Sequence, residues 1–141
     1  MADEGMDFIR SMRIATSGLR AQAGRMRVIS ENIANADSTA PTAGGDPYRR
    51  KVPTFVSELD RSLDARVVAL GRVRQDNSDF RIKHEPGNPA ADANGNVKYP
   101  NVNRVIEMTD MRDAQRSYEA NLNIISATRR MIQRTLDILK A

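Results

Sequence analysis

The sequence predicts a mainly α-helical protein in which long N- and C-terminal helices pair as a coiled coil around a small extended or β-hairpin middle segment. In both terminal regions, apolar residues recur at alternating intervals of three and four, the spacing of heptad positions a and d. The middle instead contains loops rich in Pro and Gly and short β-branched runs. We therefore expect an N-terminal helix within residues 1–38, a loop and β-rich segment at 39–100, and a C-terminal helix within 101–141.

The C-terminal helix is predicted over Met108 to Leu139, a run with no proline or glycine. Such a helix would be roughly 45 Å long. Asn103 is a suitable N-cap, and Glu107 in the first turn would be favoured by the helix dipole. The predicted stripe consists of Met111, Gln115, Tyr118, Leu122, Ile125, Arg129, Ile132, Leu136 and Leu139.

A matching stripe predicts the N-terminal helix from about Phe8 to Ala36, ending before Pro41 because proline disfavours helical geometry in the residue before it. Gly18 and Gly24 lie inside this helix. Each marks either a close approach of another backbone or a tolerated substitution, and the sequence leaves both readings open. The stripe consists of Phe8, Met12, Ala15, Leu19, Gln22, Met26, Ile29, Ile33 and Ala36.

Strand-like runs occupy the middle. Residues 52–56 form a short run in which Pro53 permits only an edge strand, and 58–65 is read as a helical turn or an irregular link. Residues 66–74 and 79–83 are predicted to pair as a hairpin around Asp76 to Ser78. Asn94-Gly95 is a turn signal, and Val97 to Pro100 is the candidate for a last strand.

Composition excludes several classes of protein. The 141 residues include no cysteine, so disulfides and thiolate metal sites are ruled out. The net charge of +4 could suggest nucleic-acid binding, but acidic residues are interspersed with the basic ones along the chain. No run of 18 apolar residues is present, and the acidic opening Met1 to Gly5 is unlike a secretory signal.

The sequence contains no arrangement typical of catalysis or metal binding, and a Ser-His-Asp set would have to be assembled from generic residues. His84 is the single histidine and has no cysteine to activate. Ala90 to Asn96 resembles part of a calcium loop, but Ala90 and Asn101 occupy the first and twelfth ligand positions, which favours a plain turn. The basic clusters Tyr48 to Lys51 and Arg129-Arg130 are interpreted as solvated faces or inter-subunit salt bridges rather than phosphate sites.

Assembly is the better interpretation of the two stripes. A single pair of helices with such thin stripes buries too little apolar surface to offset the entropy of ordering them. Apolar residues off the stripes, among them Ile124, Met131 and Ile138, widen the face beyond what one partner covers. We therefore expect the helices to be labile in the monomer and ordered by neighbouring subunits. The candidate assembly residues are Met12, Leu19, Met26, Ile29, Ile33, Met111, Tyr118, Leu122, Ile125, Ile132, Leu136 and Leu139.

Several motifs, in order along nearly the whole chain, resemble the axial rod and hook proteins of the bacterial flagellum. They are the segments 30–39, 47–51, 85–95, 99–103 and 117–121. The sequence Gly45-Asp46-Pro47-Tyr48 fits the short, proximal-rod members rather than the distal-rod or hook proteins. The motif residues are Asn32, Asn35, Tyr48, Arg49, Arg50, Tyr99, Pro100, Asn101, Tyr118, Glu119 and Asn121.

The resemblance implies a structural subunit without enzymatic activity or cofactor, located in the basal-body rod where it crosses the periplasm. It implies export through the flagellar type III apparatus, helical polymerisation, and a drive shaft that transmits torque. The implied partners are other copies, other rod proteins, the membrane (MS) ring and its adaptor protein, with no nucleic acid and no small-molecule substrate. The alternatives are a free-standing coiled-coil adaptor and a basic nucleic-acid-binding protein.

Overall fold

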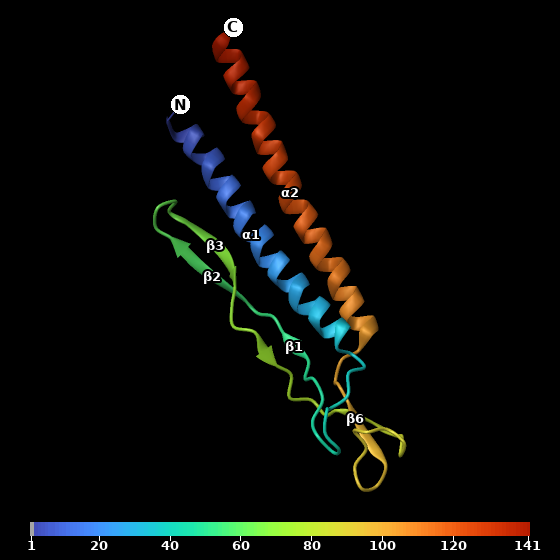
Figure 1. Cartoon of the computed structure of the whole chain (residues 1–141). Helices are drawn as coiled ribbons and strands as arrows, with labels where there is room; N and C mark the ends of the chain where they lie inside the picture. The colour runs from blue at the N-terminus through green and yellow to red at the C-terminus, as the bar shows by residue number, and fades with distance from the viewer. Residues whose placement is uncertain (1) are drawn as a thin grey trace. The chain divides into compact units, whose positions relative to one another are not determined.

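The computed structural model describes residues 2–141, with side chains from Gly5 onward, so the side chains of the acidic opening Met1 to Glu4 lie outside it. It has two long helices and a small middle that contains short β-sheets, which confirms the predicted mainly α architecture at this level. Helix α1 spans Ala2–Ala34 and helix α2 spans Arg104–Lys140. In Figure 1 the part of α1 up to Met26 and the part of α2 from Asp113 onward, which belong to one compact unit, run side by side. Within residues 2–141, no helix has an apolar stretch of the length needed to cross a membrane.

Two compact units make up the chain. The first unit combines Met1–Met26, Thr54–Arg72 and Asp113–Ala141. The second unit combines Arg27–Pro53 and Val73–Arg112. Each is described by itself below.

The helix ends follow the predicted local chemistry. Asn103 caps α2, because its Oδ1 accepts hydrogen bonds from the backbone N–H groups of Val105 (3.0 Å) and Ile106 (3.4 Å). Helix α1 ends at Ala34, before Pro41 as predicted. The carbonyl oxygen of Glu31 accepts from the backbone N–H of Asn35 at 3.1 Å and from Asn35 Nδ2 at 2.8 Å, so the residue that follows α1 bonds twice to its last turn.

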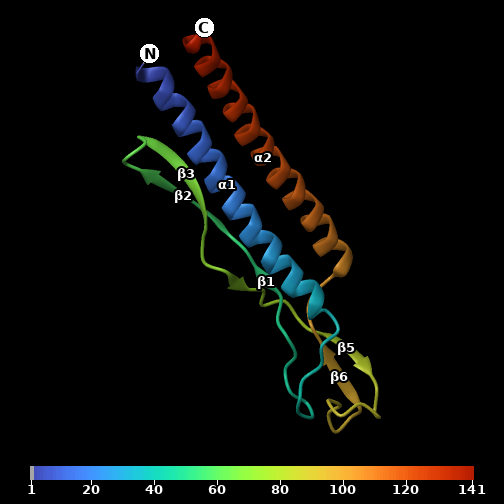
Figure 2. The ribbon, with the colours of Figure 1, turned by 45° about the horizontal axis from the view of Figure 1, so that its top comes forward.

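Three two-stranded antiparallel sheets lie between the helices in the sequence (Figure 2). Strand β1 (Lys51–Val52) pairs with β4 (Arg74–Gln75), and β2 (Phe55–Asp60) pairs with β3 (Ala65–Leu70). Strand β5 (Arg81–His84) pairs with β6 (Asn96–Tyr99), which confirms the predicted last strand. Gly95, with φ 78°, precedes β6 in the turn predicted at Asn94-Gly95.

The predicted hairpin between 66–74 and 79–83 is wrong, because β3 pairs with β2 and β5 pairs with β6. The link expected at 58–65 is instead the end of β2 and a tight turn. The Asp60 carboxylate accepts hydrogen bonds from the N–H and hydroxyl of Ser62, at 2.9 and 2.6 Å, and Asp64 adopts a φ of 47°. These local bonds close the chain onto β2 before the predicted turn at Asp76 is reached.

The face of α2 that the chain itself covers differs from the predicted stripe at alternate positions. In the first unit Ala114 and Thr128 are buried, whereas Gln115 and Leu122 are exposed. Tyr118 and Ile125, which are in the predicted stripe, are half-buried. At alternate positions of the stripe, the covered face of α2 therefore carries a smaller residue one position earlier in the sequence. The larger predicted residue next to it, such as Gln115, is exposed.

Gly18 and Gly24 of α1 each lie close to a side chain of another segment of the first unit, rather than to its backbone. A Cβ at Gly18 would lie 2.8 Å from Nδ2 of Asn121 in α2, and one at Gly24 would lie 2.8 Å from Cδ2 of Leu70 in β3. Such distances are shorter than real side-chain contacts. Gly18 and Gly24 therefore leave room for the side chains of Asn121 and Leu70, whose outer atoms would have to shift to admit a Cβ.

Candidate functional site

In the second unit, polar side chains from several segments gather around one buried amide, Asn32, near the end of α1. Its surroundings come from the loop before β1, from β1 and from the first turn of α2. We call this group the Asn32 network. Its members are Asn32, Tyr48, Arg50, Lys51, Asp76, Asn101 and Glu107.

All hydrogen-bonding positions of the Asn32 side chain are used. Its Oδ1 accepts from the Tyr48 hydroxyl at 2.8 Å and from the backbone N–H of Lys51 at 2.9 Å. Its Nδ2 donates to the Lys51 carbonyl at 2.8 Å and to Glu107 Oε2 at 3.1 Å. The amide therefore bonds one edge of β1 as a neighbouring strand would, while β4 bonds the other edge.

Glu107 is a buried carboxylate, 1 % exposed, held by Arg50. Arg50 Nε lies 2.5 Å from Glu107 Oε1, and its terminal nitrogens lie 3.4 Å from Asp76 and 3.9 Å from Asp110. Burial lowers the pKa of Arg50, but the hydrogen bond and charge of Glu107 and then of Asp76 outweigh it, so the pKa is raised. A buried carboxylate needs such a partner, since removing one member leaves an uncompensated charge.

Asn101 connects the backbone on either side of the network. Its Oδ1 accepts from the backbone N–H of Arg50 at 2.8 Å, and its Nδ2 donates to the carbonyls of Asp76 (3.0 Å) and Ser78 (3.1 Å). Arg49 donates to the same two carbonyls and stacks over the ring of Phe80, 4.2 Å from its centroid. The loop after β4 is therefore fixed by side chains that the sequence motif supplies.

Tyr48 supplies the hydroxyl of the network. Burial, with the negative charges of Glu31 and Glu107, raises the pKa of Tyr48 to about 12. The hydroxyl therefore stays protonated and keeps donating to Asn32.

Other motif residues lie elsewhere. Tyr99 packs in a small cluster with Ala90 and Val97 and donates its hydroxyl to Glu85 at 2.9 Å. The buried Pro100 accepts from Arg81 Nε at 3.1 Å. In the first unit, Tyr118 is half-buried, Glu119 is exposed and Asn121 faces Gly18.

Sequence reasoning missed two members of the network. Glu107 was assigned only to the helix dipole, and Asp76 only to a turn; each in addition faces Arg50. The basic cluster at Tyr48 to Lys51 is not a solvated face, because Arg50 binds Glu107 and Lys51 binds Glu31 within the chain.

The candidate assembly residues fall into three groups in the structure, which are buried, exposed and half-buried. Ile29 is buried, and Leu122, Leu136 and Leu139 are exposed, with 42 %, 46 % and 65 % of their surface accessible. The half-buried members are Met12, Leu19, Met26, Ile33, Met111, Tyr118, Ile125 and Ile132.

The geometry of the Asn32 network suits a structural role. Its polar groups are paired with one another, and no group of three His, Asp or Glu side chains able to hold a metal occurs in the described part of the chain. What the network does is bind the end of α1, β1, the loop after β4 and the start of α2 into one unit.

Comparison with known proteins agrees with this structural role. The model of the flagella basal body rod protein family matches residues 12–40, and that of the flagellar basal body rod FlgEFG protein C-terminal region matches residues 93–138. These two ranges include Asn32 and Asn101, two members of the Asn32 network. The fold and the matched regions define a flagellar rod protein.

Relatives that match over most of their length identify the family within this class of rod proteins. The flagellar basal-body rod protein FlgC of Agrobacterium fabrum is 55 % identical, over 92 % of this chain and 93 % of that protein. The FlgC proteins of Salmonella typhimurium and Bacillus subtilis are 39 % and 36 % identical, over 94 % and 96 % of this chain and 98 % and 100 % of theirs. The chain belongs to the family of the flagellar basal-body rod protein FlgC.

Proposed function

We propose that this chain is a structural subunit of the flagellar proximal rod that polymerises helically through its terminal helices, which pair as a coiled coil. The family supports a structural role in the basal-body rod. The polymer would join copies of this chain and other rod proteins, with the MS ring and its adaptor at its base. Subunits would arrive through the flagellar type III export apparatus, and the finished rod would transmit torque.

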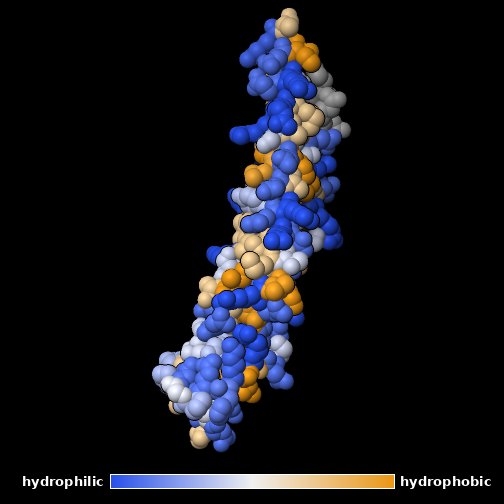
Figure 3. All heavy atoms as spheres, turned by 90° about the vertical axis from the view of Figure 1, so that its right-hand side faces the viewer, coloured by the Kyte–Doolittle hydropathy of each residue, from blue (hydrophilic) through white to orange (hydrophobic). Residues whose placement is uncertain are grey.

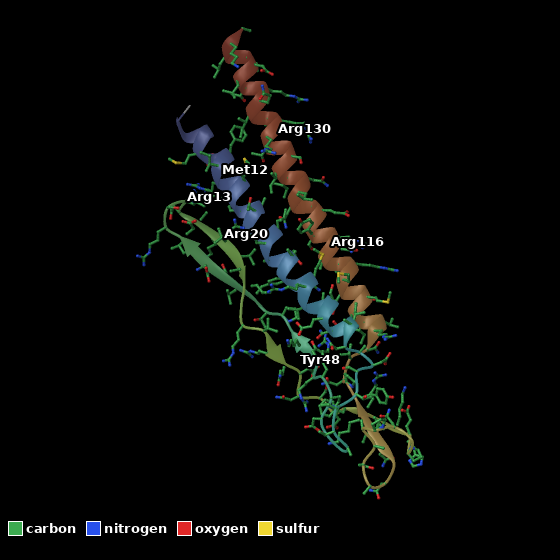
Figure 4. The ribbon with its side chains drawn as sticks, in the orientation of Figure 1. Met12, Arg13, Arg20, Tyr48, Arg116 and Arg130 are labelled. Atoms are coloured by element: carbon green, nitrogen blue, oxygen red, sulfur yellow. The ribbon has the colours of Figure 1, made fainter. Side chains whose placement is uncertain are left out.

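The observation that carries the proposal is a second apolar stripe on α2. Ile124, Met131 and Ile138 are spaced by seven residues and are 48 %, 47 % and 76 % exposed. Seven-residue spacing keeps these side chains on one side of a helix, where a further helix can pack. Arg116 and Arg130, which are also exposed, project from the same helix (Figure 4).

The free ends of the helices add to this surface. In the first unit, a groove of about 630 Å³ is lined by apolar residues from both helices, including Phe8, Ile9, Ile132 and Leu136. Figure 3 shows orange apolar side chains emerging between hydrophilic ones on the face seen from the side of α2. Exposed apolar surface of this kind marks a protein interface.

A truncation and a point substitution test the proposal. Removal of Ser126 to Ala141 should abolish motility and rod assembly while expression persists, whereas motile cells would count against it. Met131→Glu should prevent incorporation into the rod, while the control Asn123→Glu, at an exposed polar position of the same helix, should not. A density map of isolated basal bodies without these helices in the proximal rod would overturn the proposal.

A further inference from the structure

Strands β2 and β5 each have one edge without a strand partner in the part of the chain that the structure describes. β2 pairs only with β3, and β5 pairs only with β6. Both strands also expose large apolar residues, with Leu59 58 % and Ile82 66 % accessible. A free edge with exposed apolar side chains is a template for another strand.

The two free strands are complementary in sequence. β2 carries the acidic residues Glu58 and Asp60, whereas β5 carries the basic residues Arg81 and Lys83. One antiparallel register satisfies all of these residues: Asp60 opposite Arg81, Leu59 opposite Ile82, Glu58 opposite Lys83, and Ser57 opposite His84. Since side chains alternate between faces, both charge pairs share one face, and Leu59 meets Ile82 on the other.

The central charge pair is available for such a contact. Glu58 is exposed and has no ion-pair partner within the described residues. Lys83 is exposed, and its ammonium lies over the ring of Tyr99, 4.6 Å from the centroid. The outer pair is already engaged, because Asp60 lies 3.9 Å from Arg13 and Arg81 lies 3.5 Å from Asp37. Glu58 and Lys83 therefore supply the charge selectivity.

We propose that β2 of one copy of the chain adds to β5 of a second copy as an antiparallel strand pair. The proposal rests on the polymerisation proposed above. It uses different surfaces of the two copies, so each subunit retains one free strand for the next neighbour. Four residue pairs cover far less than the roughly 1,000 Å² of a stable interface. The pairing therefore forms within the assembled rod and sets the register of neighbours rather than supplying most of the affinity.

Cysteine crosslinking tests the pairing, because the chain contains no cysteine of its own that could crosslink. Directly opposite residues of an antiparallel pair have Cα atoms about 4.5–5.5 Å apart, within the range that a disulfide spans. Leu59→Cys with Ile82→Cys should give a reducible ladder of this chain in oxidised basal bodies. The single variants, and Val56→Cys with Ile82→Cys, should give none, because Val56 projects from the opposite face of β2.

Charge reversal provides a second test of the strand pairing. Glu58→Lys and Lys83→Glu should each lower swimming speed, and the double variant should restore it. The strand pairing is overturned if the double cysteine variant enters the rod but crosslinks no more than the single variants. It is also overturned if the charge swap restores nothing. Either result leaves the proposed function intact, whereas absence of the unaltered chain from basal bodies would overturn both proposals.

Discussion

The amide of Asn32 donates a 3.1 Å hydrogen bond to the carboxylate of Glu107, and neither side chain is more than 1 % exposed. The two residues are 75 positions apart in the sequence, one near the end of α1 and the other in the first turn of α2. This bond joins the two helices of the second unit through groups that would be costly to bury alone. The stability of that unit therefore depends on the pairing of Glu107 with both Asn32 and Arg50.

Glu107→Gln is expected to lower the free energy of unfolding by about 3 kcal/mol, since Arg50 would lose its closest counter-charge. The hydrogen bond with Asn32 can persist, so the loss reports mainly on the ion pair. Urea unfolding of the full chain measures it. The matched control Glu119→Gln, exposed on the same helix, should change stability by less than about 0.5 kcal/mol. Equal effects of the two substitutions would contradict the assigned role of Glu107.

Gly24→Val is expected to destabilise the first unit by roughly 1–3 kcal/mol, because the added atoms meet Leu70 of β3. Intrinsic helix propensity alone predicts that Gly24→Val raises the stability. The sign of the change in the free energy of unfolding therefore distinguishes helix propensity from the contact with Leu70. Hydrogen exchange of the β2–β3 amides should show the loss locally, and Leu70→Ala in the same chain should relieve it. Gly5→Ala is the control, with nothing within 4 Å, and should stabilise by up to about 1 kcal/mol.

Stability is expected to fall in alkali because of Tyr48. The pKa of this hydroxyl is about 12 in the folded chain and about 10 in an unfolded one. Below pH 10 both states hold the proton, so the hydroxyl adds no pH dependence. As the pH rises from about 10 to about 12, only the unfolded state loses the proton and is favoured.

Tyr48→Phe should remove this part of the alkaline slope and also lower stability at neutral pH, because Asn32 loses a donor. Subtracting the phenolate absorbance of the variant from that of the unaltered chain isolates Tyr48. A difference titration centred near pH 10 would contradict the burial of its hydroxyl.

The isolated chain is expected to be less helical than the assembled subunit. Its helices of 33 and 37 residues leave much of α2 uncovered, and the apolar burial that orders a long helix comes from its partners. Circular dichroism over a dilution series should therefore show helical content that rises with concentration. Two fully formed helices that melt cooperatively in dilute solution would refute this expectation.

The sequence by itself determined the elements whose cause is local. The apolar period and the absence of proline predicted α2, Asn103 predicted its cap, and Asn94-Gly95 predicted the turn before β6. Each of these depends on neighbours within a few positions along the chain. Local chemistry acts in the same way whatever the distant segments do.

Tertiary structure alone decided the partners. The covered face of α2 carries Ala114 and Thr128 rather than Gln115 and Arg129. Gly18 leaves room for this side of α2, and the apolar period of the sequence does not distinguish two adjacent stripes. β3 joins β2 because the turn stabilised by Asp60 connects the two strands directly. Glu107 is buried because Arg50 and Asn32 meet it from remote segments. Contacts between residues far apart in sequence follow from which surfaces fit, and no local pattern records that fit.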